Sequence, residues 1–245
     1  MDRRGFMDTP KKNGERCRWL AVVLFAAAMA WMEAATVVYL RLLVGRLDPY
    51  QAPPLPLSGN LGGTEMIREA ATLVMLLAAG FLAGRDGRRR LGYFLIAFGV
   101  WDILYYVFLA VIGGWPRGPL DWDVLFLLPL PWWGPVMAPA AIAALMIIGG
   151  TQATQFEAPA RPIWPRPFSW AANLAGCLLA LYAFMADALA ALPRGAAAVR
   201  SVLPVRFLWA VFAVGLFLIA VPLFDMAAQI RLFRHPPQSL AREES

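Results

Sequence analysis

Six long apolar stretches follow one another along the chain, separated by short polar segments. Each is long enough to supply the roughly 20 residues with which a helix crosses a hydrocarbon core about 30 Å thick. Their apolar residues run continuously and do not alternate with polar ones, which favours helices over the strands of a membrane barrel. The stretches lie at residues 19–44, 65–84, 91–113, 123–149, 168–192 and 204–230. The pattern predicts an all-α fold, a bundle of six transmembrane helices.

The composition leads to the same class of protein. Hydrophobic residues make up 60% of the 245-residue chain and charged residues 16%, and the mean hydropathy is +0.58. A soluble domain of this size could not cover so much apolar surface. Since the connections are short, we expect one membrane domain over residues 19–230. A basic cytoplasmic tail (1–18) precedes it and a second cytoplasmic tail (231–245) follows it.

The distribution of basic residues predicts the orientation. With a cytoplasmic N-terminus, 15 of the 22 lysines and arginines fall on the cytoplasmic side, as the positive-inside rule requires. The other seven lie at or near the outer face: Arg41, Arg46, Arg68, Arg117, Arg194, Arg200 and Arg206. We therefore expect both termini in the cytoplasm and a location in the bacterial cytoplasmic (inner) membrane. The basic residues that give the net charge of +6 flank apolar spans and form no patch on a folded domain. The expected partner is therefore the lipid bilayer and not nucleic acid.

The first stretch has a second interpretation. A basic segment, an apolar run from Trp19 and the step Ala28-Met29-Ala30 are typical of a cleavable signal peptide. The apolar run continues to Val44, which is longer than the apolar part of a signal peptide and favours an uncleaved anchor.

Ionisable residues gather at one depth of the predicted bundle. At 1.5 Å per residue, Glu33 lies about 21 Å above Trp19, in the outer half of the membrane. Asp102 lies about 16 Å above Leu91, and an acid at such depth is expected to face protein or water instead of lipid. The second stretch runs in the opposite direction and brings its own charged residues to the same half. The candidate site consists of Glu33, Arg68, Glu69, Asp102, Tyr105 and Asp123.

Three interpretations of this cluster stay open. In the first, the acids pair with Arg68, Arg41 or tyrosine hydroxyls and fix which helices are neighbours. The protein would then be a structural or accessory subunit of a larger membrane complex or a homo-oligomer. In the second, a pocket or proton path open to the outer side binds or passes a cation, a proton or a basic solute. In the third, the protein is an intramembrane enzyme that uses an oxygen-ligated divalent cation.

The absence of known catalytic motifs gives the enzyme interpretation little support. The sequence contains no GxSxG, no HExxH and no P-loop, so no catalytic residue is predicted and a role other than catalysis is favoured. The single histidine, His235, follows the last stretch, and Cys17 and Cys177 lie at different depths. Zinc and haem are therefore not expected, and no cofactor is predicted. Mg²⁺ and Ca²⁺, which prefer oxygen ligands, are the metals left open.

A proline-rich segment interrupts the fourth stretch. A proline inside a helix removes a backbone hydrogen bond and clashes with the preceding turn, so we expect a proline-broken fourth span. The break either lines a cavity, as in transporters, or separates an interfacial segment from a true span that begins at about Pro135. Its position near the outer end favours the interfacial segment. The residues concerned are Pro129, Pro131, Gly134, Pro135 and Pro139.

Two strings carry a resemblance to a known family. They are FGVWDILYY at residues 98–106 and WDVLFLLPLPWWGP at residues 122–135. They resemble segments of an uncharacterised family of bacterial polytopic integral membrane proteins, over roughly residues 30–150. The resemblance implies a multi-pass membrane protein and brings no activity, cofactor or site residue with it.

Overall fold

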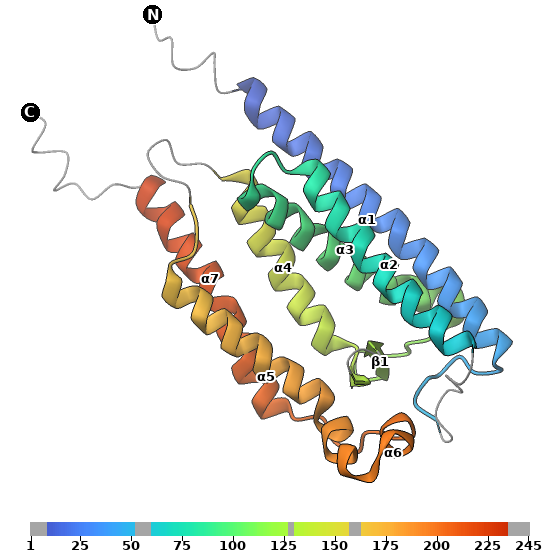
Figure 1. The fold of residues 1–245 in the computed structure, drawn as a ribbon. Coiled ribbons are helices and arrows are strands. Elements are labelled where there is room, and N and C mark those ends of the chain that lie inside the picture. The colour runs from blue at the N-terminus through green and yellow to red at the C-terminus, as the bar shows by residue number, and fades with distance from the viewer. Residues whose placement is uncertain (1–8, 52–59, 127–129, 157–162, 235–245) are drawn as a thin grey trace, which may run out of the picture.

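Six helices of the computed structural model are long and apolar enough to cross a membrane, counted over the residues that the structure describes (Figure 1). Those residues are 9–51, 60–126, 130–156 and 163–234. The six helices are α1 (Thr9–Leu43), α2 (Asn60–Ala83), α3 (Gly87–Gly113), α4 (Met137–Gln155), α5 (Pro167–Ala191) and α7 (Trp209–Arg234). Between α5 and α7 lie a 3₁₀ turn, η1 (Leu192–Arg194), and the short α6 (Ala196–Arg200). The prediction of a six-helix membrane protein is confirmed at this level.

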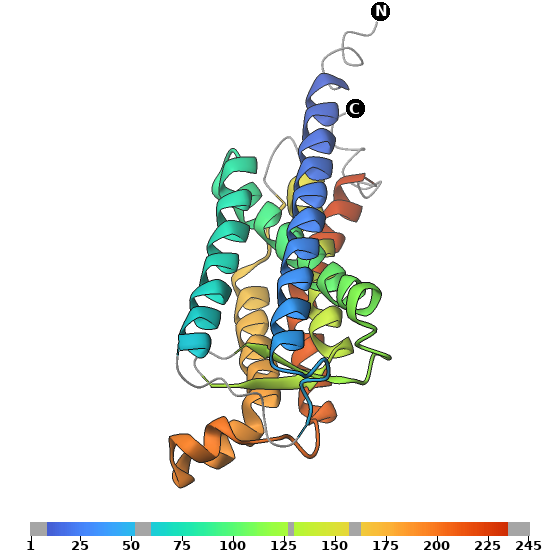
Figure 2. The same ribbon diagram turned by 90° about the vertical axis from the view of Figure 1, so that its right-hand side faces the viewer.

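The helices form two groups that meet at α4. Helix α3 packs against α1, α2 and α4, whereas α5 packs along α7, and α4 also contacts α7. The first residue of α1 and the last residue of α7 lie at one end of the bundle, which we call the tail end (Figures 1 and 2). The strands and α6 lie at the opposite end, which we call the hairpin end.

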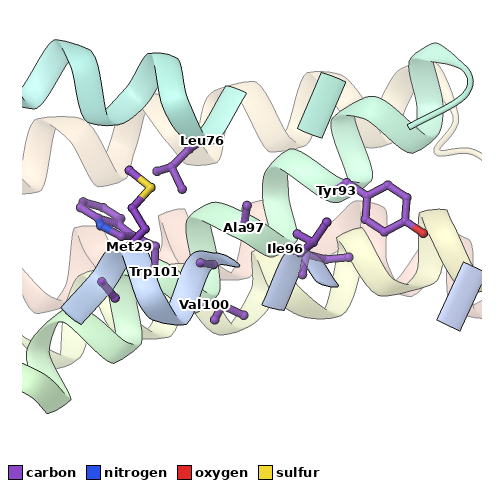
Figure 3. Close-up of a cluster of buried hydrophobic side chains, with 10 residues drawn as sticks. Met29, Leu76, Tyr93, Ile96, Ala97, Val100 and Trp101 are labelled. Carbon is purple, nitrogen blue, oxygen red and sulfur yellow. The ribbon is translucent and has the colours of Figure 1, made fainter. Parts of the chain in front are cut away.

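The core of the first group forms around α3. Tyr93, Ile96 and Ala97 of this helix are fully buried, and with Val100 and Trp101 they belong to one buried cluster that includes Met29 of α1 and Leu76 of α2 (Figure 3). Small residues allow the neighbouring helix to come close: a Cβ atom on Gly99 would lie 2.5 Å from the carbonyl oxygen of Ala143 in α4. Close packing of this kind replaces the hydrophobic effect as the force that joins helices in lipid.

Both ends of α3 are capped. Asp86 precedes the helix, and its carboxylate accepts a hydrogen bond of 3.0 Å from the backbone N–H of Arg89. Burial by itself raises the pKa of Asp86, but this hydrogen bond and the charges of Arg89 and Arg88 outweigh it and hold the pKa below its ordinary value. At the other end Gly114, with φ of 69°, takes the left-handed conformation that favours glycine.

The predicted fourth stretch, 123–149, is not one helix, and α4 begins close to the position of about Pro135 given by the interfacial alternative. Residues Trp122–Phe126 form strand β1, which pairs antiparallel with β2 (Trp132–Pro135), and α4 begins only at Met137. The all-α prediction therefore misses a two-stranded sheet. Aromatic and β-branched residues favour a strand, and proline cannot continue a helix. The structure shows no helix interrupted by the predicted prolines: Pro135 ends β2, Pro139 lies in the first turn of α4, and Pro129 lies outside the described residues.

Two further helix boundaries differ from the prediction. Helix α1 begins at Thr9, ten residues before Trp19 and inside the predicted tail 1–18. Helix α7 extends to Arg234, beyond the predicted stretch 204–230, and contains Pro222 in its interior. His235 lies outside the described residues.

Candidate functional site

A pocket of about 300 Å³ lies toward the hairpin end, among α1, α2, α3 and α4. Strand β1 contributes Asp123 and the residues that follow it, and Trp132 of β2 and Phe184 of α5 complete the lining. All six residues of the predicted site line this one pocket: Glu33, Arg68, Glu69, Asp102, Tyr105 and Asp123.

Arg68 of α2 neutralises two acids on the pocket wall. It forms ion pairs with Glu33 of α1 and with Glu65, one turn earlier in its own helix. The Nε atom of Arg68 donates to Glu65 Oε2 at 2.9 Å, and the buried hydroxyl of Thr72 lies 3.3 Å from both carboxylate oxygens of Glu33. Glu69, one turn beyond Glu65, adds a further carboxylate to the same wall. The charge of Arg68 is thus already engaged, and the network joins α1 to α2.

Arg41 of α1 holds the hairpin in place. Its Nη2 atom lies 2.9 Å from Asp123 Oδ1, and its Nη1 atom donates to the carbonyl oxygen of Leu47 at 3.2 Å. The guanidinium lies 4.3 Å from the ring centre of Trp115, a cation–π contact. Both charged residues are almost fully buried, Arg41 at 6% and Asp123 at 1% exposure. Burial raises the pKa of Asp123, and Arg41 opposes that shift by stabilising the carboxylate.

Asp102 of α3 lacks such a partner. Its side chain lines the pocket and is 8% exposed, and no described residue donates a hydrogen bond to its Oδ2 atom. The nearby carboxylate of Asp123 adds like-charge repulsion. A buried polar atom is normally paired, because leaving it unpaired costs the full penalty of its desolvation. The pocket therefore presents an acid whose counterpart is not a described part of the protein.

Aromatic rings line the same pocket, and of these only Tyr105 was predicted from the sequence as a site residue. Phe94, Phe98, Trp101 and Tyr105 follow one face of α3, with successive ring centres 6.0, 5.6 and 5.9 Å apart. Their spacing of four, three and four residues could have identified this face. Across the pocket, Trp132 stacks on Phe184 with ring centres 6.5 Å apart.

The geometry of the acids does not suit a metal ion. Among the described residues, no group of three or more His, Cys, Asp or Glu side chains is arranged to hold one. Ca²⁺ and Mg²⁺ take six or more oxygen ligands, and the carboxylates of Glu33, Glu65 and Asp123 are already paired with arginines. The divalent-cation enzyme gains no support from this arrangement.

Comparisons with known proteins add no family: no family model, no curated protein and no solved structure matches this chain. The pocket is therefore the feature from which a function can be inferred.

Proposed function

We propose that this multi-pass membrane protein binds a cation or a proton in its hairpin-end pocket, as a binding or transport protein. The observation that carries the proposal is the Oδ2 atom of Asp102, which is buried beside the pocket without a hydrogen-bond donor among the described residues. A positive ligand or a proton would remove the cost of that buried charge.

The charge balance of the lining supports a positive ligand. Five carboxylates and two guanidinium groups line the pocket, a formal excess of three negative charges. Both guanidinium groups are engaged with other acids, so neither is aimed at Asp102. An anionic ligand would have to displace an existing ion pair.

The orientation belongs to the same proposal. We place the tail end in the cytoplasm of a bacterium and the hairpin end on the outer side of the inner membrane. The support is the positive-inside rule, because most basic residues flank the tail end of the spans. In this orientation the pocket lies in the outer half of the bilayer and would exchange its ligand with that side.

The main alternative is a structural or accessory subunit of a larger complex. The pair Arg41–Asp123 joins α1 to the hairpin, and Arg68 joins α2 to α1, which is what a purely structural network would do. Asp102 separates the two candidates, because its Oδ2 atom accepts no hydrogen bond that would join α3 to another described element.

Thermal stability of the purified full-length protein tests the proposal. Wild type and Asp102→Asn would be compared between pH 5 and 8 in Na⁺, K⁺, Mg²⁺ and a quaternary ammonium salt. We expect at least one condition to stabilise wild type and not the variant. Asp187→Asn is the matched control, since Asp187 lies near the hairpin end of α5 but does not line the pocket. Identical responses of wild type and Asp102→Asn in every condition would overturn the proposal and leave the structural subunit.

A further inference from the structure

We infer that the cation taken by this pocket is organic, a single ammonium group attached to an apolar body of small-molecule size. The inference rests on the proposed function, because it names the class of ligand for the same pocket. Four features of the lining carry it: the single unpaired acid, the aromatic wall, the volume, and the separation of charged from apolar residues.

The first feature is the single unpaired acid. A metal ion needs several oxygen ligands converging on one point, and the described residues provide no such group. An ammonium group needs less: one carboxylate to balance its charge, and neighbouring surfaces that tolerate its methylene or methyl groups. Asp102 offers one carboxylate oxygen without a partner among the described residues.

The second feature is the aromatic wall beside that acid. Trp101 directly precedes Asp102, Tyr105 follows it by less than one turn, and their rings stack with an interplanar angle of 23°. The face of an aromatic ring attracts a cation within about 6 Å of its centre, and recognition of quaternary ammonium groups commonly uses such rings. Phe98 extends the wall toward the tail end. A strongly hydrated metal ion would gain little from these surfaces.

The third feature is the volume. The pocket holds about 300 Å³, which is the lower end of the range of about 300–1,000 Å³ for small-molecule sites. A water molecule takes about 30 Å³ in the liquid, so a bare ion would leave most of this space to water. The space suits a small amine or quaternary ammonium compound.

The fourth feature is the separation of charged and apolar residues along the membrane normal. Seen from Asp102, Phe98 lies about 6 Å and Phe94 about 12 Å toward the tail end of α3. Helix α4 starts at the hairpin end, and Met146 lies about 14 Å along it from Met137. The lining nearest the tail end is thus apolar, whereas the charged residues lie nearer the hairpin, among apolar ones such as Val124 and Phe126. A ligand would lie with its ammonium group at Asp102 and its apolar body pointing inward.

The test compares a cation with a neutral molecule of the same shape. Benzyltrimethylammonium and neopentylbenzene differ only in the replacement of the charged nitrogen by carbon. Binding of each to the full-length protein in lipid nanodiscs would be measured by equilibrium dialysis and by the shift in Tm. We expect saturable binding of the cation and at least about tenfold weaker binding to Asp102→Asn, the typical effect of losing a charge-assisted contact. The neutral compound should bind wild type and variant equally and weakly.

A second variant tests the aromatic wall. Phe98→Leu keeps an apolar side chain but removes one ring, so it should weaken binding of benzyltrimethylammonium and leave the response to Na⁺ and K⁺ unchanged. Asp187→Asn should bind like wild type. These two variants also keep the test decisive if Asp102→Asn is produced in low yield.

The outcomes separate the inference from the proposed function. Protection by protons or inorganic cations that depends on Asp102, without binding of benzyltrimethylammonium, would overturn the organic ligand and keep the cation site. Equal affinity for the cation and its neutral counterpart would overturn recognition of charge. No response that depends on Asp102 to any of these probes would overturn both.

Discussion

Acidic residues lie at both ends of the bundle, and their carboxylates differ in how they are paired. At the tail end, Asp225 of α7 accepts hydrogen bonds from the backbone N–H of Arg166 at 2.8 Å and from the hydroxyl of Ser169 at 2.9 Å. The side-chain amide of Gln229 donates to its other oxygen at 3.2 Å. At the hairpin end, the Oδ2 atom of Asp102 has no donor among the described residues.

The difference separates structural acids from the acid of the site. Asp225 fastens the start of α5 to α7, and Glu15 of α1 accepts a hydrogen bond of 2.7 Å from Tyr93 of α3. Each of these acids joins two elements and is satisfied by the fold itself. The Oδ2 atom of Asp102 is buried without a described donor, and this difference is the observation behind the proposed cation or proton site.

The largest expected effect concerns the side of the membrane on which each end of the bundle lies. Because the positive-inside rule places them on opposite sides of the membrane, reporter fusions should give all-or-none differences. Fusions after Asp48, Gly118 or Gly195, at the hairpin end, should report the outer side. Fusions after Asp86 or at the C-terminus should report the cytoplasm. A cytoplasmic signal after Asp48 would reverse the orientation.

The next effect concerns the paired charges of the pocket. Arg41→Met leaves Asp123 buried and uncompensated, so we expect a loss of about 3–5 kcal/mol in the free energy of unfolding. Adding Asp123→Leu to the same protein should recover much of that loss, since both charges are then gone. Reversible unfolding in mixed micelles measures both variants. If Arg41→Met alone were as stable as wild type, the close pairing of Arg41 with Asp123 would be contradicted.

A matched pair of substitutions sharpens the comparison directly. Asp225→Leu removes the acceptor of three hydrogen bonds and should lower stability by about 1–3 kcal/mol. Asp102→Leu leaves no described donor unpaired and should cost nothing, or stabilise the protein without ligand. The same unfolding measurement applies, and a loss at Asp102 equal to that at Asp225 would mean that Asp102 is a structural acid as well.

The smallest expected effect concerns an acid outside the membrane. Asp86→Asn keeps an N-cap and removes the charge next to the N-terminus of α3, so it should cost about 0.3–1 kcal/mol near pH 7. The pKa of Asp86 in the folded protein lies below its value in the unfolded chain. Its stabilisation is therefore complete above the unfolded pKa and lost as the pH falls through the folded one. Wild type and variant should become equally stable once the pH falls below the folded pKa; a gap that stays constant with pH would contradict the role of the charge.

Much of this site could be predicted from the sequence, because depth in a membrane follows from counting residues. A rise of 1.5 Å per residue puts Glu33 and Asp102 at similar heights, and both line the pocket. The pairing of Glu33 with Arg68 was among the open alternatives for the same reason. Depth alone does not say which acid remains unpaired.

The rest depends on tertiary structure. The guanidinium of Arg41 pairs with Asp123, which lies 82 residues further along the chain. Because of this pairing, the guanidinium is not available to Asp102. The hairpin that carries Asp123 was not predicted, because Trp122–Phe126 belongs to an apolar run long enough to be a span. Only the pairing of its residues with Trp132–Pro135 identifies it as a strand. No local sequence pattern predicts that pairing.

The most direct test of the proposed role of Asp102 is the free energy of unfolding of wild type and Asp102→Asn, measured with and without benzyltrimethylammonium. Without ligand, the variant should be at least as stable as wild type, because it lacks a buried unpaired charge. At a ligand concentration of about 100 times Kd, wild type should gain about 2.7 kcal/mol and become the more stable protein. A variant that is less stable than wild type without ligand, and that gains as much from the ligand as wild type does, would contradict the central claim that Asp102 is kept for a positively charged ligand.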